Sequence, residues 1–92
     1  MAGDPSPPRR LLIVDDQPDL LFILTRQLAR EGIAATVCTS PADALQALAG
    51  GSFIGALVDL YFGDLPAGWD LVSAIRQDER HARLPIVSMS GA

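Results

Sequence analysis

Four short apolar runs alternate with three longer amphipathic segments along this chain of 92 residues. Short runs rich in branched side chains are typical of strands buried on both faces, and they occupy residues 10–15, 34–38, 53–58 and 84–89. Apolar residues at helical spacing predict helices from Pro18 to Gly32, from Ser40 to Gly50 and from Trp69 to Arg80. This βαβαβαβ order predicts one α/β domain with a parallel sheet and right-handed crossovers.

Local signals set the expected helix ends. Asp16 is a candidate N-cap with Pro18 in the first turn, and Gly32 is the expected C-terminal stop. Ser40 precedes Pro41 in the same way at the next helix. Trp69 opens the third helix, and we expect its side chain to pack in the core. The alternatives are that it packs against the preceding loop or lies exposed as a contact for a partner.

Composition narrows the class of protein. Residues 1–9 hold three prolines and predict a flexible tail, which leaves residues 10–92 as the domain. The net charge is −4 and the seven basic residues, all arginines, are scattered, so we expect no nucleic-acid partner. No run is long and apolar enough for a secretory signal peptide or a membrane span. The single cysteine, Cys38, which we expect to be buried, fits a reducing compartment. We therefore expect a cytoplasmic location.

Two of the apolar runs end in carboxylates. Leu11–Val14 runs into Asp15 and Asp16, and Ile54–Val58 runs into Asp59. If both runs are parallel strands, their carboxyl ends meet at the sheet edge where open α/β sheets place their binding sites. Three like charges at close range repel, and a divalent cation with oxygen ligands would neutralise them. The sequence thus predicts an anionic pocket that holds Mg²⁺.

Three motifs in order give a family resemblance. LLIVDDQPDLL carries the acidic pair, Asp59 ends the third expected strand, and LPIVSMSGA supplies the hydroxyl of Ser90 after the fourth. From residue 10 to 92 the chain resembles a response-regulator receiver domain, the phosphoacceptor module of two-component signalling. The resemblance implies a flavodoxin-like sheet, phosphorylation on Asp59 by a histidine kinase or phosphotransfer protein, and Mg²⁺ held by Asp15, Asp16, Asp59 and the Tyr61 carbonyl. It also implies that Ser90 hydrogen-bonds the phosphoryl group.

The chain departs from the receiver pattern in three respects. The family continues through a further helix, strand and helix, and its fifth strand carries a lysine that pairs with the phosphoryl group. Residues 1–92 stop after the fourth expected strand and contain no lysine, which would weaken phosphorylation. The loop LYFGDLPAGWDL lacks the usual Met-Pro pair and places Gly68 one position later than in the family.

These departures keep several functions open. The first hypothesis is a receiver-like signalling protein, a phosphoacceptor rather than a turnover enzyme, with weakened phosphorylation. The alternative is a non-phosphorylated pseudo-receiver that acts as a dimerisation or protein-interaction module. The residues could also be the front of a longer receiver, and a small metal-dependent phosphatase is disfavoured because the chain has no cap to close over a substrate.

The strand arrangement also bears on partners. In the family's strand order 2-1-3-4-5, a sheet without strand five leaves strand four as an exposed edge that bears Ile86 and Val87. We therefore expect a homodimer or swapped oligomer that covers strand four, by strand addition or by packing of apolar faces.

For His81, in a cluster of charged residues, we expect no role as a phosphorelay histidine.

Overall fold

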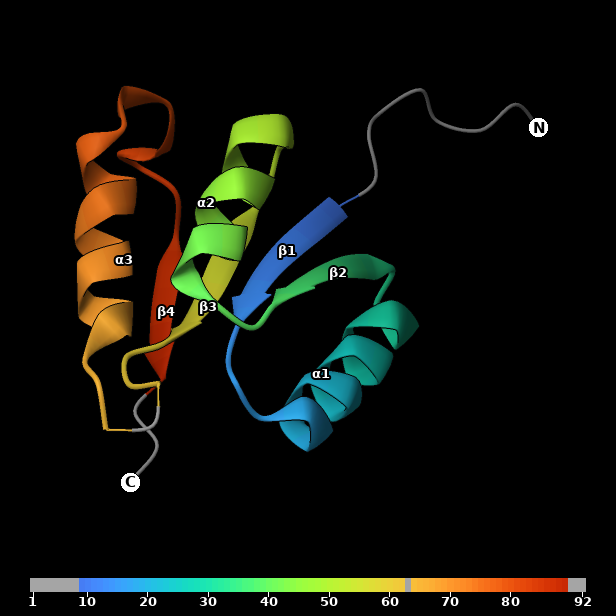
Figure 1. Cartoon of the computed structure of the whole chain (residues 1–92). Coiled ribbons are helices and arrows are strands. Elements are labelled where there is room, and N and C mark those ends of the chain that lie inside the picture. The colour runs from blue at the N-terminus through green and yellow to red at the C-terminus, as the bar shows by residue number, and fades with distance from the viewer. Residues whose placement is uncertain (1–8, 63, 90–92) are drawn as a thin grey trace.

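A four-stranded parallel sheet forms the centre of the molecule. The computed structural model describes residues 9–62 and 64–89. Its strands are β1 (Arg9–Val14), β2 (Ile33–Cys38), β3 (Gly55–Asp59) and β4 (Ile86–Met89), and they lie in the order β2-β1-β3-β4 (Figure 1). The predicted fold class, with its βαβαβαβ order, is confirmed.

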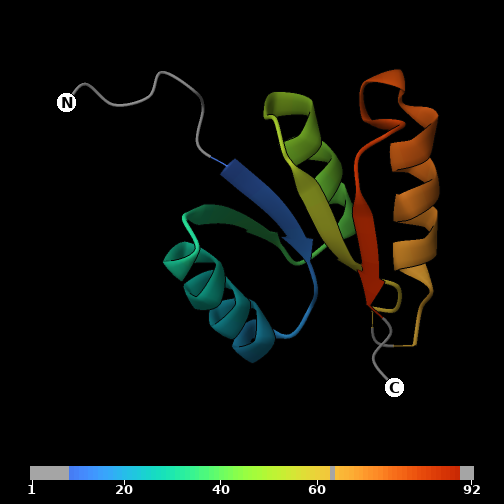
Figure 2. The same cartoon turned by 180° about the vertical axis from the view of Figure 1, so that it is seen from behind.

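Three helices cover the sheet unequally. Helices α2 (Pro41–Gly50) and α3 (Ala67–Gln77) lie together on one face, and α1 (Pro18–Arg30) lies beside β2 on the other (Figures 1 and 2). The largest buried cluster is between the sheet and the α2–α3 layer, and it contains Leu12, Val14, Cys38, Ala44, Leu48, Ala56, Val58, Leu71, Ile75 and Leu84. None of the helices in the described ranges is long and apolar enough to cross a lipid bilayer.

The observed helix ends agree with two of the three predicted from the sequence. Ser40 caps α2 as predicted, because its Oγ accepts a hydrogen bond from the Asp43 N–H at 3.2 Å. Gly32 follows α1 with φ of 76°, a left-handed conformation that suits glycine. The prediction that Asp16 caps α1 is wrong: the N-cap is Gln17, which makes no side-chain capping bond.

The third helical segment is shorter than its apolar pattern predicts. Helix α3 ends at Gln77, and the 3₁₀ helix η1 (Glu79–His81) follows. The Asp78 carboxylate accepts a hydrogen bond from the Arg80 N–H at 3.0 Å, and this local bond opens the new turn. Trp69 does not pack in the core as expected, since 54% of it is exposed.

Strand β4 is the outer strand on one side of the sheet, as predicted. Val87 on this strand is 59% exposed. Ile86, which we expected on the exposed edge, is half-buried and packs against the core cluster. Figure 2 shows β3 and β4 from the face opposite α2 and α3, where none of the described helices covers them. Part of the apolar surface of β4 therefore remains accessible.

Candidate metal centre

The strand register brings the three acidic residues together. Val14 of β1 is paired with Val58 of β3, so Asp15 and Asp59 follow at the same level of two adjacent strands. Asp16 is next along the chain, and one carboxylate oxygen from each of the three residues lies within 4.8 Å of the others. The convergence predicted from the two apolar runs is confirmed.

Backbone hydrogen bonds orient two of these carboxylates. Asp15 Oδ1 accepts from the Gln17 N–H at 2.9 Å, and Asp59 Oδ1 accepts from the Tyr61 N–H at 3.1 Å. Both bonds span two residues, as in Asx turns, where an aspartate at the end of an element binds the backbone that follows it. The sequence analysis missed these bonds, although an aspartate followed by a turn is the signal that could have predicted them.

The pocket is electrostatically strained without a cation. Asp15 is 3% exposed and Asp59 is 5% exposed. Burial raises the pKa of Asp15 above its usual value, the hydrogen bond from Gln17 opposes this rise, and repulsion from Asp59 and Asp16 adds to it. Over the described ranges, no arginine or histidine forms an ion pair with Asp15 or Asp59. The buried carboxylates of Asp15 and Asp59 supply the oxygen donors that a hard divalent cation such as Mg²⁺ prefers.

Tyr61 and Ser90 are the predicted site residues outside the acidic triad. Tyr61 directs its N–H to Asp59, and the role of its carbonyl as a metal ligand stays a prediction. Ser90 lies outside the described residues, so its contact with a phosphoryl group also stays a prediction. The preceding residue is close to the site, because the Leu60 N–H donates to the Met89 carbonyl at 2.9 Å.

Gly68 supports the loop that follows Asp59. Its N–H donates to the Leu60 carbonyl at 3.1 Å, and Gly68 is buried. A Cβ at this position would lie 2.5 Å from Leu60 Cα and closer still to the Asp59 carbonyl oxygen. The start of α3 can therefore approach the end of β3 only because residue 68 has no side chain. The sequence analysis noted the position of this glycine but not its contact with the backbone of the acidic site.

Comparisons with known proteins agree with this geometry. The family model for the response regulator receiver domain matches residues 11–92. A sensor protein from Polaromonas sp. JS666 is 34% identical, with a TM-score of 0.83 over 92% of this chain and 67% of that one. A response regulator receiver protein from Pseudomonas putida is 28% identical, with a TM-score of 0.83 over 95% of this chain and 71% of that one.

A more distant structure shares the fold. The response regulator TrrA from Thermotoga maritima is 21% identical, with a TM-score of 0.79 over 91% of this chain and 70% of that one. No curated protein sequence is significantly similar to the chain.

We predict that Gly68→Ala destabilises the protein by about 3 kcal/mol, because the added methyl group forces apart the backbones of α3 and the loop after Asp59. The same displacement moves Asp59, so the affinity for Mg²⁺ falls as well. Denaturant unfolding and calorimetric titration measure the two effects. Gly50→Ala is the matched control, because no atom lies within 4 Å of its added Cβ, and equal losses in both variants would contradict the packing argument.

A second prediction concerns pH and metal. Because the folded-state pKa of Asp15 is raised above 3.8, the metal-free protein loses stability as the pH rises from that value through the raised pKa. Asp15→Asn removes this loss, so the metal-free variant is more stable than the parent at neutral pH. Mg²⁺ at about 100 times its Kd stabilises the parent by about 2.7 kcal/mol and Asp15→Asn much less.

Thermal unfolding with and without Mg²⁺ checks this prediction, and Asp70→Asn is the control, since Asp70 is exposed in the first turn of α3. Equal stabilisation of all three proteins by Mg²⁺ would refute the assignment of Asp15 to the metal centre.

Proposed function

Because the chain belongs to the response-regulator receiver family, we propose that it accepts a phosphoryl group on Asp59, with Mg²⁺ assistance, as a signalling protein of a two-component phosphorelay. The observation that carries this proposal is the close approach of Asp15, Asp16 and Asp59 at one edge of the sheet. A receiver is a phosphoacceptor module and not an enzyme in the usual sense. In this proposal the chain is a signalling switch.

The proposed chemistry assigns a separate role to each acid. One Asp59 oxygen accepts the Tyr61 N–H, which orients the carboxylate so that its other oxygen can attack phosphorus. A P–O bond to Asp59 forms as the P–N bond of a phosphohistidine breaks, and the electron pair of that bond goes to the leaving imidazole. Mg²⁺ bound by Asp15 and Asp16 would neutralise charge on the phosphoryl oxygens. In the same proposal the Tyr61 carbonyl completes the ligands and Ser90 hydrogen-bonds the phosphoryl group.

Solved structures of a similar fold support the choice of cofactor and partner. TrrA was solved in complex with Mg²⁺ and BeF, and also in complex with the histidine kinase ThkA. We extend these two properties to this chain as part of the proposal: Mg²⁺ as the cofactor, and a histidine kinase or phosphotransfer protein as the phosphodonor. The free thiol of Cys38 is compatible with a cytoplasmic location, which the proposal includes.

One observation favours a different function. The loop LYFGDLPAGWDL after Asp59 lacks the Met-Pro pair usual in receivers, and it places Gly68 one position later than the family does. Because this loop adjoins Asp59, a changed loop geometry would misplace the reacting groups and slow phosphoryl transfer. The second candidate is therefore a pseudo-receiver that is not phosphorylated and acts through dimerisation or protein interaction.

Phosphorylation in vitro distinguishes the two candidates. We predict that incubation with Mg²⁺ and acetyl phosphate adds the mass of one phosphoryl group to the intact protein, and that Asp59→Asn abolishes the gain. Asp70→Asn, a matched change on the exposed surface of α3, keeps the gain. No gain in a protein that binds Mg²⁺ would support the pseudo-receiver and overturn phosphoryl acceptance.

We also propose that β4 mediates self-association. Its outer edge is unpaired within the described sheet, and the exposed side chain of Val87 lies on the same strand. Edge strands with accessible apolar side chains tend to pair with another chain. A second copy of this protein could cover β4 by strand addition, by packing on its apolar face, or by exchange of a segment.

The self-association proposal predicts a dimer in light scattering coupled to size exclusion, and a monomer for Val87→Glu, which places a charge in the proposed interface. Val37→Glu provides the control. Val37 is an exposed valine on β2, the strand at the opposite edge, so this variant stays dimeric. A stably folded monomer for the parent protein would exclude this role for β4.

A further inference from the structure

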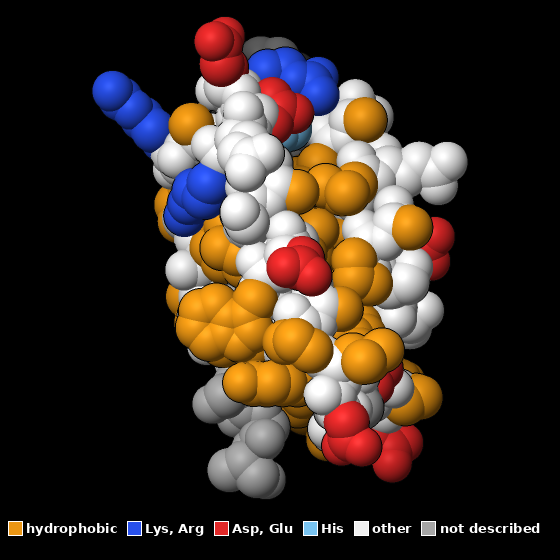
Figure 3. Space-filling view, turned by 60° about the vertical axis from the view of Figure 1, so that its left-hand side comes forward, with side chains coloured by type: hydrophobic (Ala, Val, Ile, Leu, Met, Phe, Trp, Pro, Cys, Tyr) orange, Lys and Arg blue, Asp and Glu red, His pale blue; other side chains and the backbone are white. Residues whose placement is uncertain are grey.

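Arginine side chains gather at the amino-terminal ends of the strands, at the end of the molecule opposite the acidic pocket. Most blue side chains in Figure 3 lie in its upper half, the end where the strands of Figure 1 begin. The arginines at strand starts, at helix C-termini and in the segment before β4 are Arg9, Arg10, Arg30, Arg76, Arg80 and Arg83. Among the described residues, this end of the sheet therefore offers several cationic groups to an anionic ligand, although Asp78 and Glu79 lie there as well.

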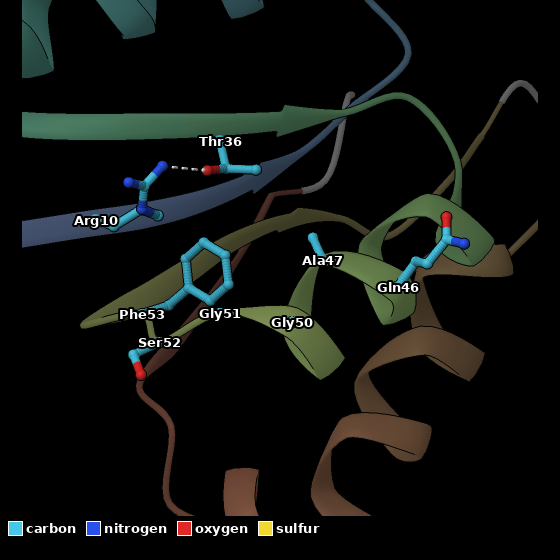
Figure 4. Close-up of a pocket in the computed structure, with 8 residues that line it drawn as sticks. All are labelled: Arg10, Thr36, Gln46, Ala47, Gly50, Gly51, Ser52 and Phe53. Atoms are coloured by element: carbon cyan, nitrogen blue, oxygen red, sulfur yellow. Dashed lines mark hydrogen bonds between the residues drawn. The ribbon is translucent and has the colours of Figure 1, made fainter.

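Two adjoining cavities open at this end. The first has a volume of about 590 Å³, and Figure 4 shows Arg10, Thr36 and Phe53 among its lining residues. The second has a volume of about 620 Å³ and is lined on its far side by Arg80, His81 and Arg83. Both cavities share the segment 51–53, so together they form one groove with arginines at its two ends.

Contacts within the protein fix the walls of this groove. Arg10 is half-buried, and its Nη1 donates to Thr36 Oγ1 at 3.3 Å (Figure 4). On the far side, Arg76 donates to the carbonyl oxygen of Leu84 at 2.6 Å and to two carbonyls of the preceding turn. A groove held in place before binding loses less conformational entropy when a ligand arrives.

The floor of the groove is suited to a peptide backbone. Gly51 is extended, with φ of −147° and ψ of 172°. Within the part of the chain that the structure describes, the N–H groups of Ser52 and Phe53 donate no hydrogen bond. The ring of Phe53 is half-buried and lines both cavities, so it offers an apolar surface between the two cationic ends.

The charges favour a ligand that spans the groove. Arg80 is paired with Asp78 at 3.3 Å, and Glu79 lines the second cavity, so Arg10 and Arg83 are the main cations available to a ligand. Arg10 lines one cavity and Arg83 lines the other, so a ligand that contacts both must extend across the segment 51–53. An extended peptide could place a carboxylate near each, and its backbone carbonyl oxygens could accept hydrogen bonds from the N–H groups of Ser52 and Phe53.

We propose that this groove binds an extended acidic peptide segment, with acidic side chains on both sides of an apolar residue that packs on Phe53. The site lies at the amino-terminal ends of the strands, whereas Asp59 lies at the carboxyl end of β3. Binding there does not depend on phosphorylation. It would give the protein a second surface for a partner.

Fluorescence anisotropy with a labelled short peptide tests the proposal, using glutamates on both sides of a central phenylalanine and a glutamine counterpart, without Mg²⁺. We expect the glutamate peptide to bind about tenfold more tightly than the glutamine peptide. Arg10→Gln and Arg83→Gln should each weaken its binding about tenfold, while NMR signals of Ser52 and Phe53 shift on titration of the parent protein.

Arg26→Gln is the control, because Arg26 lies on α1 over the Phe22 ring and outside the groove. Arg83 is exposed, so its variant remains informative if Arg10→Gln fails to fold. Absence of binding, equal affinity for both peptides, or an equal loss in Arg26→Gln would each overturn the proposal.

Discussion

The pairing of β1 with β3 is the constraint on which the acidic site depends. Val14 and Val58 are both fully buried and face each other in the register, and the two aspartates follow them directly. Leu12, Ile13 and Val14 are all fully buried, so a slip of one residue would carry the charged Asp15 into the buried level that Val14 occupies. The boundary between buried apolar residues and carboxylates therefore fixes the register. The same burial that stabilises the fold therefore forces like charges together, which is unfavourable until a cation binds.

Close backbone packing extends this constraint into the loop after β3. Gly68 allows α3 to begin against the backbone of Asp59 and Leu60, and the Tyr61 N–H holds the Asp59 carboxylate. The end of β4 is tied to the same loop through the bond between Leu60 and Met89. The site is thus connected by hydrogen bonds to the edge strand, and a partner that covers β4 would contact the same structural unit.

Sequence reasoning predicted the fold and the acidic site because both follow from simple periodicity. Apolar runs that alternate with amphipathic helices give the strand order, and acids at the ends of two runs must meet if those runs are adjacent. Predictions that depend on the exact faces and ends of helices were less accurate. Asp16 has the residue type of an N-cap, but its carboxylate joins the acidic cluster and Gln17 takes the capping position.

The exposure of Trp69 and the groove at the amino-terminal ends of the strands were harder to predict. Burial on α3 follows the residues Gly68, Leu71 and Ile75, and Trp69 lies beside this stripe. The preference of tryptophan for buried sites could not show which side of the helix it would occupy. The groove combines Arg10 with Arg80 and Arg83 from the other end of the sequence, and in the linear order these arginines look scattered.

Separation of charge between the two edges of the sheet gives the molecule a permanent electric dipole moment. The acidic triad lies at the carboxyl ends of the strands and six arginines lie toward the amino ends, so the side-chain charges set up a dipole that the oppositely directed helix dipoles partly offset. In dilute salt, a positively charged protein that diffuses toward the domain would experience a torque that turns its basic surface toward the aspartates before contact. The rate of such encounters would decrease with rising ionic strength, as mobile ions screen the field.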